Sequence, residues 1–309
     1  MLRGRTAEAL PITLGQRRIF VLPTPPGLSF GALLLAMLVA SLNYNLSLGF
    51  ALTFLLLGVA HLAMVRAHRN LLGVCLASGR CAPAYAGEAR TALLGLSESA
   101  DRPRHALAIG AIDGNAVDVS LLPARNETSV TVVLPTRPRG AHPIGRLRLD
   151  TRHPLGLVVA WSYFEPDLAG LVYPAPEADP PALPIAEGDG EGIRLKHGEG
   201  SSFDSLRPYR YGDHPRRIAW RQLARGGPLA TKHFDAEVGG ERWLSWDACP
   251  ATMDTEARLS RLCAWALLAE QAEQEWGVKL PGQRIGPASG PGHLHEVLGA
   301  LARFGGGQR

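Results

Sequence analysis

The feature that most limits how this chain can fold is a stretch of 39 residues, 27–65, without a single Asp, Glu, Lys or Arg. One helix of that length would be about 58 Å long at 1.5 Å per residue. That is about twice the ~30 Å hydrocarbon core of a bilayer. The polar triplet Asn43-Tyr44-Asn45 divides the stretch. The sequence therefore predicts a hairpin of two membrane-spanning helices, about 26–43 and 46–65, rather than a cleaved signal peptide.

The charges beside the hairpin predict its orientation. Basic residues stand on both sides of it: Arg3, Arg5, Arg17 and Arg18 before, and Arg66 and Arg69 after. The turn between the spans is neutral, and basic flanks remain in the cytoplasm. We therefore expect a multi-pass protein with both termini, including a segment 1–24, in the cytoplasm. The spans offer no polar path for transport, so the hairpin is interpreted as an anchor.

Residues 70–178 have the pattern of a small antiparallel β-sandwich domain. Short apolar or alternating runs recur about every ten residues between Gly, Pro, Asn and Asp. The runs cover 106–112, 116–121, 129–135, 146–150, 155–161 and 170–174. Residues 179–192 follow, rich in Pro, Gly and acidic residues, and are predicted to be an exposed linker.

The pattern changes to α/β near the end of the chain. Residues 242–248 and 278–280 are typical of short buried strands, and apolar residues at helical spacing predict helices over 255–276 and 293–304. The first of these helices is expected to stop at Gly277. A strand–helix–strand–helix order predicts a small parallel sheet.

An arginine block, residues 203–225, lies between these parts. It holds six arginines against two aspartates, so its charge of +4 equals the formal charge of the whole chain. Arginines on phosphates with aromatics on bases would suit nucleic acid, but no lysine and no known nucleic-acid motif support that use. Ser201 and Ser202 in "GEGSSF" do not form a nucleophile elbow. A structural knot remains open, in which Asp213 holds guanidiniums and Ile218 packs beside Trp220.

The block resembles the signature of a bacterial family, the domain of unknown function 58. The signature R-x-Y-x-x-G-D-x-x-R-x-I-x-W-x-x-x-A-R is matched by Arg207, Tyr209, Gly212, Asp213, Arg216, Ile218, Trp220, Ala224 and Arg225. "TRHPLGLVVAW" (151–161) and "TKHFDAE" (231–237) look like further family segments. Ala219, where many members carry a polar residue, is one departure. The resemblance implies that residues 193–309 hold the signature and a truncated von Willebrand factor A-like α/β domain, in the short proteobacterial form.

The same resemblance implies a function. Members look like membrane-anchored partners of MoxR-type AAA+ ATPases and of transglutaminase-like membrane proteins, in the bacterial inner membrane. We therefore expect a non-enzymatic adaptor or scaffold in the assembly or maturation of envelope proteins, without a cofactor and with no nucleic-acid partner. The alternative is a juxtamembrane protein that binds a polyanion, anionic lipid or nucleic acid, through the arginine block.

A metal site is the remaining implication of an A-like domain. Such domains hold a divalent cation through D-x-S-x-S, since hard ions prefer oxygen ligands. Here Asp247 begins "DACPA", with Cys249 and Ala251 in the two serine positions. Asp247 is therefore expected to mark a degenerate, metal-free position. His293 and His295 are spaced i, i+2 and are expected to be surface or cap residues.

Overall fold

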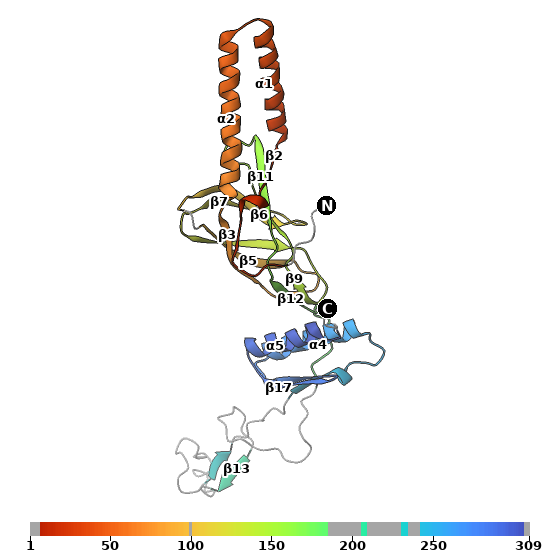
Figure 1. Ribbon diagram of the computed structural model, residues 1–309. Coiled ribbons are helices and arrows are strands. Elements are labelled where there is room, and N and C mark those ends of the chain that lie inside the picture. Colours follow the sequence, from red (N-terminus) through yellow and green to blue (C-terminus); the bar gives the residue numbers. More distant parts are fainter. Residues whose placement is uncertain (1–6, 99–100, 185–204, 209–229, 234–241, 306–309) are drawn as a thin grey trace. The chain divides into compact units, whose positions relative to one another are not determined.

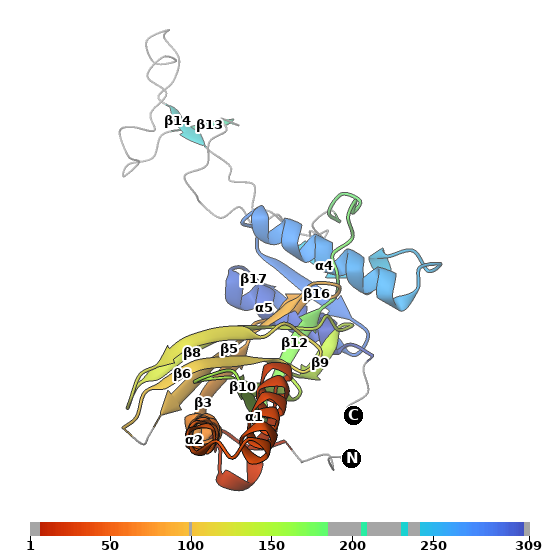
Figure 2. The same cartoon turned by 90° about the horizontal axis from the view of Figure 1, so that it is seen from above.

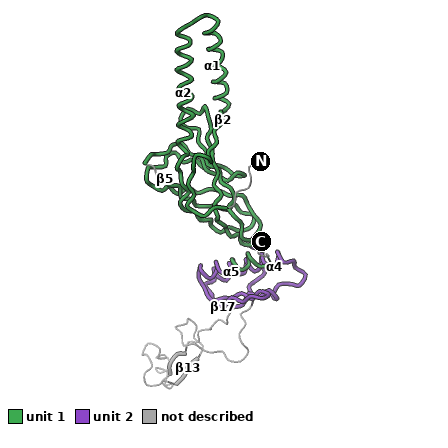
Figure 3. Tube along the Cα trace, viewed as in Figure 1, with its two compact units in different colours: residues 1–175, 299–309 green, residues 176–298 purple. Residues whose placement is uncertain are grey.

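The computed structural model describes residues 7–98, 101–184, 205–208, 230–233 and 242–305 of the chain. The chain divides into two compact units (Figure 3). The first unit comprises residues 1–175 with 299–309, and the second comprises residues 176–298. Each unit is described by itself below.

The predicted helical hairpin is present in the first unit. α1 (Pro25–Asn43) and α2 (Ser47–Leu71) lie side by side, and both are long and apolar enough to cross a membrane (Figures 1 and 2). α1 begins where the Thr24 hydroxyl accepts a hydrogen bond from the Gly27 amide at 3.2 Å, a typical N-cap. α2 is longer than the predicted span, because its helix continues past the apolar stretch through Arg66 and Arg69. The hairpin therefore carries its own basic end turn.

Small residues bring the two helices together. A side chain at Gly49 of α2 would begin only 2.3 Å from the Ser41 hydroxyl of α1, so this position has room for glycine alone. The Ser41 hydroxyl donates to the Met37 carbonyl at 2.7 Å, and the Thr53 hydroxyl donates to the Gly49 carbonyl at 2.8 Å. Both hydroxyls are thus satisfied within their own helices, as an apolar surrounding requires.

Three antiparallel or mixed sheets make up the rest of the same unit. A four-stranded sheet has the order β1 (Ile12–Thr13), β3 (Val74–Cys81), β5 (Arg90–Glu98) and β8 (Glu127–Leu134). A five-stranded sheet has the order β2 (Phe20–Pro23), β11 (Val158–Phe164), β10 (Leu147–Thr151), β6 (Arg104–Ala111) and β7 (Val117–Leu122). A small sheet joins β4 (Ala84–Tyr85), β12 (Ala169–Tyr173) and β9 (Gly140–Pro143). Only the β4–β12 pairing among these is parallel.

One hydrophobic core is shared by the two larger sheets. Along β8, Val130, Val132 and Leu134 are buried whereas the residues between them are exposed, the two-residue alternation of a half-buried strand. Leu76, Leu94 and Leu96 from the first sheet and Leu107, Ile109, Leu149 and Phe164 from the second are fully buried in the same cluster. Burial of this apolar surface holds the two sheets against each other.

Each of the six predicted runs overlaps a strand in the structure, with ends that differ by one to three residues. The sequence did not indicate β3, β4, β5 or β9, nor the two strands that precede the hairpin. β1 pairs with β3 and β2 pairs with β11, so residues 12–23 complete two different sheets. Strands of two and four residues are too short to show an alternating pattern, which is why the first segment gave no strand signal.

The second unit contains a three-stranded sheet with helices. Its elements are β15 (Arg242–Ser245), a short 3₁₀ turn at Trp246–Ala248, α4 (Thr255–Gln271), β16 (Trp276–Leu280), β17 (Gln283–Ala288) and α5 (Pro291–Arg303), whose last residues are grouped with the first unit. β15 and β16 are parallel, as predicted, and β17 adds an antiparallel strand that was not predicted. β13 (Ser205–Pro208) pairs antiparallel with β14 (Ala230–His233).

The predicted end of the first helix at Gly277 was wrong. α4 starts at its N-cap Asp254, whose side chain accepts from the Ala257 amide at 2.7 Å, and it ends at Gln271. Gly277 is instead inside β16, where a Cβ would lie 2.7 Å from both the Ile285 carbonyl and the Trp243 ring. This glycine lets two neighbouring strands and an indole approach, rather than ending a helix.

Candidate functional site

Most of the arginine block lies outside the described residues. Arg207 is in β13, where its backbone pairs with Thr231 of β14. The other signature residues are Tyr209, Gly212, Asp213, Arg216, Ile218, Trp220, Ala224 and Arg225, and they lie outside the described residues.

Asp247 lies in the exposed 3₁₀ turn that follows β15. Its amide donates to the Ser245 hydroxyl at 3.3 Å, and Cys249 two residues later is buried. Among the described residues, no group of three or more His, Cys, Asp and Glu side chains gathers closely enough to hold a metal ion.

The prediction of a surface position for His293 was wrong. His293 is buried, with its Nε2 atom 2.8 Å from the Trp276 carbonyl oxygen and its ring edge-on to the Trp276 indole at 4.6 Å. His295 is exposed. The imidazole of His293 therefore helps to join α5 to β16, because spacing along a helix alone does not show which face a sheet covers.

Residues just before and at the start of the predicted linker are attached to α4. The Glu177 carboxylate receives two hydrogen bonds from Arg261, at 2.8 and 2.9 Å, and this lowers the pKa of Glu177. The Trp265 indole donates to the Pro181 carbonyl at 2.8 Å. Cys263, on the buried face of the same helix, has its pKa raised to about 12 by burial. Residues 177–181 are thus held by the helix.

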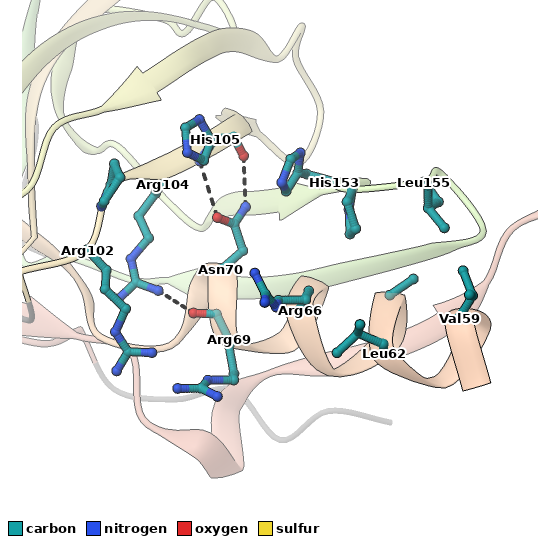
Figure 4. Close-up of a pocket in the computed structure, with 13 residues that line it drawn as sticks. Val59, Leu62, Arg66, Arg69, Asn70, Arg102, Arg104, His105, His153 and Leu155 are labelled. Atoms are coloured by element: carbon teal, nitrogen blue, oxygen red, sulfur yellow. Dashed lines mark hydrogen bonds between the residues drawn. The ribbon is translucent and has the colours of Figure 1, made fainter. Parts of the chain in front are cut away.

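A pocket of about 650 Å³ is the clearest candidate site in the first unit (Figure 4). Three segments far apart in the sequence line it: α2 between Val59 and Asn70, residues 102–105 at the start of β6, and residues 153–155 before β11. Because it surrounds the end of a helix able to cross a membrane, we call it the juxtamembrane pocket. Its volume lies within the ordinary range for small-molecule sites.

Asn70 fixes one wall of the juxtamembrane pocket. Its amide nitrogen donates to the His105 carbonyl at 2.8 Å and to the Thr151 hydroxyl at 3.0 Å, and its amide oxygen accepts from the His105 amide at 3.2 Å. Thr151 in turn donates to the Ala106 carbonyl at 2.9 Å. Asn70 is nearly buried, so these bonds replace water on both polar groups of the His105 backbone.

Arg104 fixes the helix end itself. Its side chain is 4% exposed and forms an ion pair with Glu98, whose side chain is fully buried. The same guanidinium donates to the carbonyl of Arg69 and, at 2.7 Å, to that of Leu72. These carbonyls end α2 and carry the negative pole of its dipole, so a cation here stabilises the helix terminus. The last turn of α2 is therefore bonded to the sheet.

α1 is bonded to the same sheet at its first turn. The Thr24 hydroxyl donates to the Gly156 carbonyl at 2.5 Å, and the Thr24 amide donates to the Leu157 carbonyl at 3.0 Å. Gly27 lies so close to the Leu157 backbone that a Cβ would overlap it, at 1.9 Å from the carbonyl oxygen. The start of α1 is thus fixed to the loop before β11, and the end of α2 is fixed to β6.

The rim of the juxtamembrane pocket is basic. Arg66, Arg69 and Arg102 are exposed, and within the described part of the chain their side chains make no hydrogen bond or ion pair. The rings of His105 and His153 lie 5.4 Å apart on the opposite wall. The lining residues include no Asp, Glu, Ser, Thr or Cys. The arrangement is suited to holding an anion.

Sequence reasoning missed this pocket. "RAHRN" (66–70) was noticed only as a basic flank of the hairpin, and "RPRH" (102–105) was not noticed at all. Two basic clusters of this kind, one at a helix end and one before a strand, are the only signal that the sequence offered.

Comparisons with known protein families, with curated proteins and with solved structures found no match to this chain. The resemblance to the domain of unknown function 58 family therefore stays a prediction that depends on the signature residues from Arg207 to Arg225.

Proposed function

We propose that the protein is a non-enzymatic adaptor or scaffold that fixes a folded module to the bacterial inner membrane, with both termini in the cytoplasm. The observation that supports this is the attachment of both helix ends to the β domain, through Thr24 on α1 and through Asn70 and Arg104 on α2. A hairpin joined in this way transmits position and orientation to the domain, which a flexible tether does not.

The hairpin itself favours anchoring over transport. Ser41 and Thr53 are the buried polar residues within the spans, and their hydroxyls donate hydrogen bonds to carbonyls of their own helices. Polar groups that serve a transport path instead face a water-filled cavity or each other. An anchor that places a domain at a fixed height above the lipid suits a protein that presents a client to a partner.

The partner in this proposal comes from the resemblance of the arginine block. A MoxR-type AAA+ ATPase would dock on the cytoplasmic part, and a transglutaminase-like membrane protein would lie beside the hairpin. The C-terminal unit would be a truncated von Willebrand factor A-like domain, for which its parallel β15–β16 pair followed by α5 gives partial support.

The test is purification of the intact protein from native membranes while ATP hydrolysis is blocked, with the bound proteins identified by mass spectrometry. We expect an AAA+ ATPase with the wild type and with the control Arg80→Ala, which removes an exposed arginine of β3. Arg216→Ala should lose the ATPase while its thermal unfolding and its membrane content stay at the wild-type level. Absence of any ATPase in several mild detergents would refute the adaptor proposal.

A further inference from the structure

We propose that the juxtamembrane pocket binds the phosphate headgroup of an anionic phospholipid, with the acyl chains of that lipid lying along α2. This site is separate from the arginine block and does not depend on the adaptor proposal. It is built from residues of the hairpin and of the β domain in one compact unit.

The charge of the pocket is the first reason. Arg104 is neutralised by Glu98, and Asp101, the acid next to the rim, pairs with Arg125 at 3.1 Å. Arg66, Arg69 and Arg102 remain as three exposed guanidiniums without a counter-charge in the described part of the chain. Three like charges around one hollow repel each other until an anion enters, and guanidinium groups match phosphate oxygens with paired hydrogen bonds.

The position of the pocket relative to the apolar helix surface is the second reason. Val59 and Leu62 line the pocket from the uncharged stretch of α2, and Leu62 and Leu155 are each 54% exposed. Arg66 follows one turn after Leu62, at the point where the uncharged stretch ends. A ligand that contacts both the arginine rim and these apolar side chains has an anionic head and an apolar tail. A soluble anion would leave the leucines unused.

The third reason is that the walls are fixed before any ligand arrives. Asn70 and Arg104 each make several hydrogen bonds that join α2 to the sheet, so residues 66–70 and 102–105 keep their spacing. Figure 4 shows the residues of α2 and those at the start of β6, with the hydrogen bonds of Asn70 and Arg104 between them. A site that is already ordered loses little conformational freedom on binding, which favours affinity.

An alternative role for the arginines is to set topology alone, because basic residues near helix ends retain that end in the cytoplasm. Topology requires only charge near the membrane and does not require a pocket. Arg102 is 31 residues beyond the end of α2, in a loop of the β domain, and yet it completes the rim. A specific headgroup site accounts for this convergence.

The experiment measures lipid binding to the purified full-length protein in neutral detergent. Short-chain phosphatidylglycerol is titrated against the wild type, Arg66→Gln/Arg102→Gln and the charge-matched control Arg80→Gln/Arg137→Gln, whose arginines are exposed but do not line the pocket. We expect about a 25-fold weaker dissociation constant for the pocket variant, about fivefold per arginine, the equivalent of about 1 kcal/mol each. The control should change less than twofold.

Two further ligands identify what is recognised. Short-chain phosphatidylcholine tests the need for net negative charge, and glycerol 3-phosphate tests the need for acyl chains. Both are expected to bind at least tenfold more weakly than phosphatidylglycerol. If phosphatidylcholine binds equally well, or if the two double variants behave alike, the proposal is wrong. Equal binding of glycerol 3-phosphate would show a site for a soluble anion and would also overturn it.

A measurement on the wild type alone gives an independent test in case the variants fail to fold. Raising the ionic strength from 0.1 to 1 M shortens the Debye length from about 10 to about 3 Å, so phosphatidylglycerol binding should weaken steeply. Binding that does not respond to salt would contradict a site built from three exposed arginines.

Discussion

Replacement of Arg104 by Met is expected to destabilise the β domain severely. The change leaves the Glu98 carboxylate buried without its cation, and it removes the donors of the Arg69 and Leu72 carbonyls at the end of α2. Loss of one partner of a buried ion pair costs about 3 to 5 kcal/mol. We expect the free energy of unfolding to fall by about that amount, because the Met side chain fills most of the space but carries no positive charge and donates no hydrogen bond.

The double variant Glu98→Met/Arg104→Met separates the charge from the packing. Removal of both charges leaves no buried carboxylate, so its cost should be smaller than that of Arg104→Met alone. The two carbonyls of α2 still lose their donor, at about 1 to 3 kcal/mol for buried polar groups left unpaired. The expected order of stability is therefore wild type, then the double variant, then Arg104→Met.

Pulse proteolysis in detergent micelles, across a series of urea concentrations, measures these free energies without crystals or labels. Arg125→Met is the matched control, because its ion pair with Asp101 is exposed and surface pairs contribute about 1 kcal/mol or less. A cost below about 1 kcal/mol for Arg104→Met would refute the reasoning. So would a double variant that is less stable than Arg104→Met alone.

Three other outcomes follow from the described contacts. Asn70→Leu should cost about 2 to 4 kcal/mol, since it leaves the amide and carbonyl of His105 unpaired. Hydrogen exchange of the His105 amide should then rise sharply, and unchanged exchange would contradict the proposed wall. The Glu177–Arg261 pair contributes stability above the usual glutamate pKa of 4.5, and this contribution is lost as the pH falls through the lowered pKa of Glu177 in the folded protein. Glu177→Gln should remove that acid-dependent loss from a thermal melt recorded between pH 7 and pH 3, and identical pH profiles would count against the pair. Cys263 should resist alkylation at pH 8 until the protein unfolds, because its pKa of about 12 and its burial leave almost no thiolate; rapid labelling detected by mass spectrometry would show that the α4 core opens.

The sequence predicted those helices and strands whose residues show a charge-free stretch or an alternating apolar pattern. The two long helices follow from the uncharged stretch, and β6, β8 and β11 follow from runs of alternating or apolar residues. The strands before the hairpin were missed because β1 and β2 are too short to alternate. Gly277 was misread because a glycine that admits a neighbouring indole and a glycine that ends a helix look identical in sequence.

The juxtamembrane pocket was beyond local reasoning for a different reason. Arg66 and Arg102 lie in separate segments, and the bonds of Asn70 to the His105 backbone and of Arg104 to the end of α2 bring them to one hollow. Glu98 and Arg104 also look like ordinary surface charges in the sequence, whereas both are buried. Sites made by contacts of long sequence separation need the tertiary fold before they can be recognised.

The route of the chain through the hairpin has a consequence for how the protein is made. β2 enters α1 from the five-stranded sheet, and α2 returns to β3 of the four-stranded sheet. A hairpin that crosses a bilayer twice returns the chain to the compartment it left, so β2 can meet β11 only after both crossings are complete. If α1 and α2 cross a bilayer, membrane insertion precedes closure of the sheets. The ribosome must also deliver residue 158 before the strand at Phe20–Pro23 gains its partner. In that case a failed insertion would leave β1 and β2 without their partners β3 and β11, with the edges of both sheets open to proteolysis.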